Sequence, residues 1–327
     1  MRGNTFGKLF SITTFGESHG VALGVVVDGV PAGLEFKLED LQELLDRRRP
    51  GRLNVTTARN EADQAEVLSG IFEGKTLGTP IAVIVRNTNQ RSQDYDKEMA
   101  RPGHGDITFT QKFGHRDHRG GGRASGRETL ARVAGGYFAG LVLKEVQFKA
   151  FISKIAKFES GDIDPFSTQF KKLHFGDPEK EEEIEKYLLD LKKNGESAGG
   201  KVRLHIRGLS AGLGEPVFDK LKADLAKAMT SIGSCVGVTF GIGEDFTDTP
   251  GSVATKSREN FGGIEGGISN GEELVMTLFF RAPSTVGQKA KEGRHDPCIL
   301  PRVLPVVEAM AKLTIADHQM RQNAYQI

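Results

Sequence analysis

Apolar and polar residues alternate along several short stretches of this chain, and a period of two predicts strands with one buried face. The clearest case places Val202, Leu204 and Ile206 on one side of a segment whose other positions are polar or charged. A short unbroken apolar run at 81–85 is typical of a strand buried on both faces. The predicted strands are 8–15, 21–27, 81–85, 201–207 and 274–281.

Apolar residues three and four positions apart predict the helices. In 37–49, four leucines form one stripe, arginines occupy the last turn, and Pro50 and Gly51 end the helix. Ser125 and Glu128 form the pattern S-x-x-E of a capping box, so a helix is expected from about Gly126. The other predicted helices are 179–193, 218–229 and 303–321.

The helix expected from Gly126 contains two adjacent glycines, Gly135 and Gly136. Each glycine inside a helix costs about 1 kcal/mol relative to alanine. The apolar stripe of this helix continues beyond the pair, to Leu141. We therefore interpret the two glycines as a site where the helix packs closely against another backbone.

Two pairs of short segments resemble each other. The sequence DGVPAGL at 28–34 resembles RGLSAGL at 207–213, and each lies between a predicted strand and a predicted helix. The sequences GKTLG at 74–78 and GISNG at 267–271 each precede a strand at a similar offset. Such self-similarity indicates two related halves.

No proline- or serine-rich linker separates these halves, which run over roughly 1–150 and 195–327. We therefore expect a single domain, 1–327, with internal pseudo-symmetry. The elements predict an α+β fold in which helices and mostly antiparallel sheets pack in two or more layers.

The composition argues against several classes of protein. The 44 basic and 43 acidic residues nearly cancel, whereas a nucleic-acid-binding protein usually has a clear basic excess. The longest apolar runs are far below membrane-spanning length, and the N-terminus has no signal-peptide core. Cys235 and Cys298 form no metal-spaced pair, which favours reduced thiols in a cytoplasmic protein. Glycine is unusually frequent, with 41 residues placed in turns and loops.

Five loops combine glycine or proline with charge, and four of them contain histidine. Their sequences are GESHG (16–20), RRRPGR (47–52), RPGHGD (101–106), GHRDHRGGGRASGR (114–127) and GRHDPC (293–298).

The longest loop, 114–127, could bind a metal ion, nucleic acid or a small anion. A metal would need more ligands than His115, Asp117 and His118, and the surrounding arginines oppose a cation. Nucleic acid would need aromatic residues between the basic ones, and few are present. A small anion fits best, because arginines and three consecutive glycines lead into a predicted helix N-terminus.

Three histidines, His19, His104 and His295, lie in tight loops where a cationic imidazole can donate to a leaving phosphate oxygen. Asp296 is a candidate base beside His295. No residue has the surroundings of an activated nucleophile, since GESHG does not match the G-x-S-x-G pattern. The loops together predict a site for a molecule that carries several negative charges.

Several stretches, taken in order, resemble one family, the chorismate synthases. They are GNTFGKLFSITTFGESHG, LLDRRRPG, NTNQRSQDY, RPGHGD, RDHRGGGRASGRE and GRHDPC, and the similarity runs from residue 3 to about 320. The resemblance implies a β-α-β sandwich with helices between two antiparallel sheets, and usually a homotetramer. It also implies conversion of 5-enolpyruvylshikimate 3-phosphate into chorismate and phosphate, the last step of the shikimate pathway. This anti-1,4-elimination needs reduced FMN without net redox change.

The resemblance also implies roles for residues. His19 would lie near the flavin with Ser18 beside it, His104 would donate to the departing phosphate, and Asp296 would act in the proton transfer. Substrate anions would be held by Arg48, Arg101, Arg127 and Arg294. The FMN-binding residues would be Arg123, Ala124, Ser125, Gly266, Arg281, Ala282, Pro283, Ser284, Thr285 and Arg294. No metal is implied.

The chain departs from the family pattern at several positions. Ala124 stands where the family often has a serine, RAPSTV (281–286) replaces a sequence such as KPTSSI, and the segment 287–293 is short. Some family members bind NADPH and reduce their own flavin. This chain has no obvious extra segment, so an external flavin reductase is expected to supply reduced flavin.

Two other classes of protein stay open on the residues alone. A flavin- or nicotinamide-dependent oxidoreductase would consume reduced cofactor in proportion to product. A non-enzymatic protein that binds anions or nucleic acid would show no turnover, and its binding to a polynucleotide would depend strongly on salt.

Overall fold

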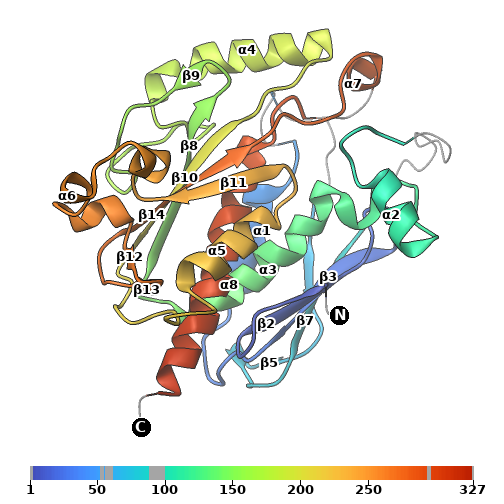
Figure 1. Ribbon diagram of the computed structural model, residues 1–327. Helices are drawn as coiled ribbons and strands as arrows, with labels where there is room; N and C mark the ends of the chain where they lie inside the picture. Colours follow the sequence, from blue (N-terminus) through green and yellow to red (C-terminus); the bar gives the residue numbers. More distant parts are fainter. Residues whose placement is uncertain (1–2, 52–54, 56–61, 88–99, 293–295, 326–327) are drawn as a thin grey trace.

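The computed structural model describes the chain except for residues 1–2, 52–54, 56–61, 88–99, 293–295 and 326–327. Two five-stranded antiparallel sheets enclose a layer of helices (Figure 1). The first sheet has the order β1 (Thr5–Phe6), β2 (Ser11–Phe15), β3 (Ala22–Asp28), β7 (Ile81–Arg86) and β4 (Ala65–Val67). The second has the order β11 (Cys235–Phe240), β14 (Leu274–Phe280), β10 (Gly200–Arg207), β8 (Gln147–Ile155) and β9 (Phe158–Glu159).

Four helices form the layer between the sheets, and the rest lie outside it (Figure 1). The inner helices are α1 (Leu38–Arg48), α3 (Thr129–Val142), α5 (Leu221–Thr230) and α8 (Leu300–Asn323). The outer ones are α2 (Asp106–Phe113), α4 (Glu181–Asn194), α6 (Gly251–Ala254) and α7 (Gln288–Glu292). Two small hairpins complete the elements: β5 (Ile71–Phe72) with β6 (Lys75–Thr76), and β12 (Ile264–Glu265) with β13 (Ile268–Ser269). The expected α+β sandwich is confirmed.

The core follows from the alternation in the strands. In β10 the alternate residues Val202, Leu204 and Ile206 are fully buried, and they stand opposite buried residues of β14. The first sheet repeats this arrangement, with Val25 of β3 opposite Val83 of β7. Helix α8 is buried on most of its surface because it packs against β8 and β10 of the second sheet and against α1, α3 and α5.

Three predicted helices begin three residues away from the expected position, and strand β2 begins at Ser11 rather than at residue 8. Helix α5 begins at Leu221 because Asp219 adopts a positive φ of 57°, and Phe218 is 85 % exposed. Helix α8 begins at Leu300, three residues earlier than expected, because Pro301 suits the first turn.

The capping box is the third difference, because only one half of it forms. Ser125 Oγ accepts a hydrogen bond from the Arg127 N–H (3.3 Å), followed by a 3-10 turn, and helix α3 itself starts at Thr129. The Glu128 carboxylate accepts from Thr14 Oγ1 (3.1 Å) and Arg132 Nε (2.9 Å) instead. The N–H of Ser125 donates to the Gly122 carbonyl.

The internal repeat is visible in matching hydrogen bonds. Thr76 Oγ1 donates to the Pro31 carbonyl (2.6 Å) and accepts from the Leu34 N–H (2.9 Å). Ser269 Oγ does the same with the Ser210 carbonyl (2.7 Å) and the Leu213 N–H (2.9 Å). The strand orders β2-β3-β7-β4 and β8-β10-β14-β11 also correspond. The fold therefore has internal pseudo-symmetry, while the division at 150 and 195 stays a prediction; residue 150 itself lies within β8.

The two helix glycines of α3 lie where close packing was predicted. A Cβ added at Gly136 would lie 2.4 Å from the Cβ and 2.6 Å from the Cα of Ala309 in α8. A Cβ at Gly135 would lie 2.9 Å from a methyl group of Ile12 in β2. The prediction of backbone contact is thus confirmed for Gly136, and Gly135 packs against a side chain of the first sheet.

We expect Gly136→Ala to lower the free energy of unfolding by about 1–3 kcal/mol, the usual cost of overpacking a core. Gly140→Ala in the same helix is the matched control, since the nearest atom to its added Cβ is 3.8 Å away. That variant should gain up to about 1 kcal/mol from helix propensity. Urea denaturation followed by circular dichroism measures both, and equal changes at the two positions would contradict the packing argument.

Candidate active site

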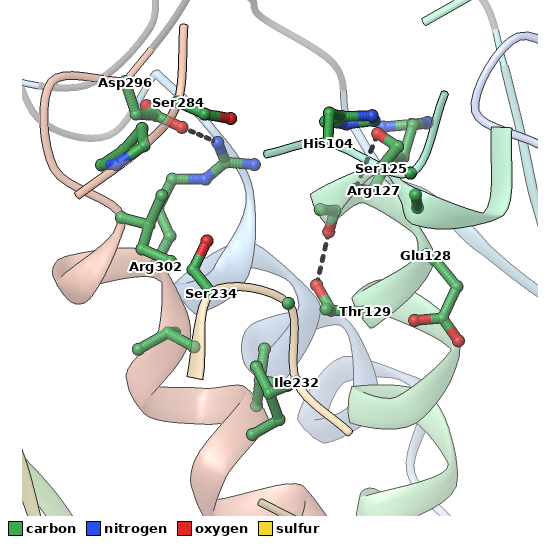
Figure 2. Close-up of a pocket in the computed structure, with 18 of the residues that line it drawn as sticks. His104, Ser125, Arg127, Glu128, Thr129, Ile232, Ser234, Ser284, Asp296 and Arg302 are labelled. Carbon is green, nitrogen blue, oxygen red and sulfur yellow. Dashed lines mark hydrogen bonds and ion pairs between the residues drawn. The ribbon is translucent and has the colours of Figure 1, made fainter. Parts of the chain in front are cut away.

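A cavity of about 470 Å³ lies where the N-terminal ends of α3 and α8 meet. Figure 2 shows His104, Ser125 and Arg127 on one side of it, and Ser284, Asp296 and Arg302 on the other. Its walls are formed by the C-terminal end of α1 and by segments 101–105, 120–129, 231–234, 281–285 and 296–306. Four of the five loops singled out in the sequence therefore contribute to one cavity.

The cavity is suited to anions. The N-terminal ends of α3 and α8 both lie at it, and the positive ends of the two helix dipoles favour negative charge there. Only Glu128 and Asp296 among its described lining residues carry negative charge. The lining arginines are Arg48, Arg101, Arg123, Arg127, Arg132, Arg281 and Arg302.

Asp106 holds His104 and Arg101 together at one wall. Its carboxylate accepts from Arg101 Nε (2.8 Å), Nη2 (2.9 Å) and the backbone N–H (3.0 Å), and it also lies within hydrogen-bond distance of His104 Nδ1 (3.1 Å). Burial alone would raise the pKa of Asp106, but the hydrogen bonds from Arg101 outweigh it and keep that pKa far below its usual range. Burial and the nearby Arg101 lower the pKa of His104, and Asp106 partly offsets this.

The glycine-rich loop packs directly over two histidines. Gly120 has a φ of 64°, and a Cβ there would lie 2.2 Å from His19 Cδ2. Gly121 has a φ of 98°, and a Cβ there would lie 2.8 Å from His104 Cε1. Glycine is required at both positions, and the loop thereby brings His19 next to a cavity-lining residue.

Ser18 lies under the same loop and is 1 % exposed. Its hydroxyl has no hydrogen-bond partner among the described residues. A buried hydroxyl left in this state is costly unless water or a ligand satisfies it. Ser18 and His19 are thus placed beside the cavity without being part of its lining.

The opposite wall carries Asp296 and Arg302. The Arg302 guanidinium forms an ion pair with the Asp296 carboxylate, as Figure 2 shows. Arg281 Nη2 donates to the Gly103 carbonyl (2.6 Å) and so ties segment 281–285 to the loop that carries His104. Pro283, Ser284 and Thr285 line the cavity, with Ala282 next to them in the chain.

Arg48 and Arg127 enter the cavity from α1 and from the turn before α3, and both are almost fully buried. Asp63, which was not predicted from the sequence, pairs with both of them.

Arg123 turns toward the first sheet, where its Nη2 donates to Thr14 Oγ1 (2.6 Å). Arg123, Ala124 and Ser125 are all lining residues.

Three further expected residues are absent from the described lining of the cavity. Gly266 is in the turn of the β12–β13 hairpin and is outside the lining of this cavity. Arg294 and His295 lie outside the described residues. Asp106 and Arg302 were also missed; Asp106 belongs to the quoted motif RPGHGD, which was a usable signal, whereas Arg302 had none.

The described residues were also compared with what a metal site, a reactive thiol and a membrane-spanning helix would require. No group of three or more His, Cys, Asp or Glu residues is placed there to hold a metal ion. Burial raises the pKa of the Cys298 thiol to about 12, so this thiol stays protonated at neutral pH. None of the described helices combines the length and apolar character needed to cross a bilayer.

Comparison with known proteins identifies the family. A family model described as chorismate synthase matches residues 10–320. The chain belongs to the chorismate synthase family. It is 44 % identical to the chorismate synthase of Christiangramia forsetii, with all of both chains covered, and 45 % identical to that of Synechocystis sp., with 98 % of each covered.

A solved structure agrees with this family. The crystal structure of a chorismate synthase superposes with a TM-score of 0.76 at 28 % identity, covering 96 % of this chain and 93 % of the other. The resemblance seen in the sequence motifs is thus confirmed, as is the fold class. The chain is an enzyme, a lyase of aromatic amino acid biosynthesis that acts on a small molecule.

Replacing Asp106 tests the electrostatics around His104. Asp106 raises the pKa of His104, whereas burial and Arg101 lower it. Asp106→Asn removes the one raising contribution and should therefore lower the pKa of His104 further, so that the imidazole loses its proton at a lower pH. Titration of the His104 Cε1–H resonance by NMR measures this shift. Asp117→Asn, whose carboxylate pairs with Arg119 instead, should leave that resonance unchanged.

Proposed function

We propose that this chain converts 5-enolpyruvylshikimate 3-phosphate into chorismate and phosphate by an anti-1,4-elimination that requires reduced FMN. This reaction is the last step of the shikimate pathway. The observation that carries the proposal is an arginine-lined cavity at two helix N-termini, with His104 and Asp296 on opposite walls. Such a cavity suits a substrate with one phosphate and two carboxylates.

Substrate binding would rest on Arg48, Arg101 and Arg127. Each is held by a buried carboxylate, Asp63 or Asp106, so its guanidinium is oriented before a ligand arrives. Guanidinium groups bind phosphate and carboxylate through paired hydrogen bonds. Preorganised donors of this kind lose little entropy when they bind.

His104 would donate a proton to the departing phosphate. Its Nδ1 faces Asp106, which leaves Nε2 as the nitrogen that can meet a substrate. Arg101 Nη2 lies 3.2 Å from the same imidazole, so a phosphate bound to Arg101 would lie near His104. Asp296 would move the proton that leaves carbon, from the opposite wall.

The cavity also has residues that could hold FMN. Segment 281–285 offers the side chains of Ser284 and Thr285, and Ser125 offers a hydroxyl at the turn before α3. The Ser18 hydroxyl beside His19, which bonds to no other described residue, fits a further polar ligand near this loop. Bound reduced flavin would supply electron density as the phosphate departs. Gly266 and Arg294 would also bind flavin, a role that rests on the family resemblance alone.

The supply of reduced flavin and the assembly are part of the same proposal. We propose that an external flavin reductase provides reduced FMN, with NADPH as the source of its electrons, and that the enzyme works in the cytoplasm as a homotetramer. Phe218 and Val236 are large apolar side chains that are 85 % and 64 % exposed in one chain, which supports burial against further copies.

An anaerobic assay tests the proposal. The protein is mixed with 5-enolpyruvylshikimate 3-phosphate and dithionite-reduced FMN, and chorismate, phosphate and flavin absorbance are followed together. Many turnovers with the flavin still reduced are the expected result. Flavin oxidised in proportion to product would support an oxidoreductase, and a folded protein with no product would refute the proposal.

His104→Ala should reduce kcat by about 10²–10⁴-fold, the usual contribution of a general acid. FMN binding should be nearly unchanged, since the role of His104 is at the phosphate. His118→Ala is the control, because His118 is a loop residue outside the cavity lining and its loss should leave turnover intact. An undiminished rate for the His104 variant would remove it from the mechanism.

Asp296→Asn should slow the elimination by a similar factor, about 10²–10⁴-fold, because an amide does not accept the proton. Single-turnover rates with preloaded substrate measure this step separately from binding. A wild-type single-turnover rate would show that Asp296 takes no part in proton transfer.

A further inference from the structure

Asp63 is a fully buried carboxylate that lies between two cavity arginines. Its Oδ1 accepts a hydrogen bond from Arg127 Nη1 at 2.8 Å, and its Oδ2 accepts one from Arg48 Nη2. The Asp63 side chain is 0 % exposed, and those of Arg48 and Arg127 are 1 % and 5 % exposed. Both arginines nevertheless line the cavity.

The three residues come from separate parts of the chain and are anchored independently. Gln42 of α1 accepts from the N–H of Ala65 (3.1 Å), and its amide donates to the Asp63 carbonyl (3.3 Å). Arg127 Nε donates to Asn87 Oδ1 (2.6 Å), just beyond strand β7. Asp63 itself has a φ of 46°, a conformation that is uncommon for residues other than glycine. This anchoring gives the carboxylate one defined position.

The Asp63 carboxylate reduces the repulsion between the guanidinium groups of Arg48 and Arg127. Two buried guanidinium groups of like charge repel each other strongly in a region of low dielectric constant. Asp63 cancels one of the two positive charges and uses only one N–H donor of each arginine. A guanidinium has five such donors in a planar fork, and both arginines line the cavity. The trio retains a net charge of +1.

We propose that Asp63 is a positioning residue: it holds Arg48 and Arg127 at one fixed separation and orientation, so that together they receive anionic groups of the substrate. This role deepens the proposed function and rests on it. Asp63 has no role in the chemical step, because both of its oxygens are engaged with the arginines.

Asp63→Asn is the variant that tests the role. An amide keeps one accepting oxygen but presents N–H donors to the second guanidinium, so one arginine is released. We expect KM for 5-enolpyruvylshikimate 3-phosphate to rise about 10- to 100-fold, since small displacements of binding groups have effects of this size. The value of kcat should change by less than about threefold, because the arginines bind substrate before and during the reaction alike.

Asp317→Asn is the matched control for lost stability. Asp317 is also a buried carboxylate, in α8, and its Oδ1 accepts from the N–H groups of Lys8, Leu9 and Phe10. It is outside the cavity lining. This variant should lower the melting temperature while leaving KM and kcat at wild-type values.

A double-mutant cycle separates positioning from a general structural effect. In an Arg127→Lys background the geometry that Asp63 maintains is already lost, so Asp63→Asn should raise KM by less than about threefold more. Asp317→Asn should have no effect on KM in either background. A wild-type KM for Asp63→Asn, or full additivity with Arg127→Lys, would overturn the proposal. If Asp63→Asn does not fold, Asp63→Glu, which keeps the charge but shifts it, enters the same cycle.

The wild-type chain is assayed first, so that two failures are distinguished. If it does not turn over, the proposed function fails. Calorimetric binding of the same phosphate ester then replaces KM as the readout for the Asp63 variant, and unchanged affinity overturns the positioning role. If the wild type turns over and Asp63→Asn behaves like it, only the role of Asp63 is refuted.

Discussion

The close approach of α3 and α8 is the contact on which the rest of the structure depends. Gly136 of α3 lies so near Ala309 of α8 that a Cβ on Gly136 would have no room. Helix α3 packs on the first sheet and α8 on the second, so this contact sets how closely the two halves join. The same approach brings the N-termini of both helices to one cavity, where their dipoles favour anions.

Buried carboxylates organise the charge around that cavity. Asp63 and Asp106 each hold two of the groups that the proposed reaction would use, and Asp296 is paired with Arg302. Without carboxylate partners, arginines in a buried site would repel one another or turn toward solvent. The carboxylates hold them in place while leaving the site with a net positive charge, which a multiply charged substrate requires.

Local elements could be predicted where one face of the chain is buried. The strands with alternating residues, such as β10, formed as expected because burial selects one face. The predictions were wrong at the ends of helices and strands, where tertiary contacts compete with the local sequence pattern. The Glu128 carboxylate accepts hydrogen bonds from Thr14 and Arg132 rather than from the Ser125 N–H that a capping box would use. Helix α5 begins at Leu221, later than predicted, because Asp219 adopts a positive φ. The partners of Asp63 are far from it in sequence, so no local pattern could reveal them.

The sequence by itself determined strands β2, β3, β7, β10 and β14, the four inner helices and α4, the repeated turn motifs and the loops that carry arginine and histidine. It did not reveal β8 and β11, which lie in the second sheet. It also determined the family, because several motifs in a fixed order are far more specific than any one of them. Only the tertiary structure decided which side chains meet: that Asp63 joins Arg48 to Arg127, that Asp106 orients His104, and that Gly266 lies outside the cavity lining. The reason is physical, since hydrogen bonds and ion pairs act over a few ångströms in space, whatever the separation along the chain.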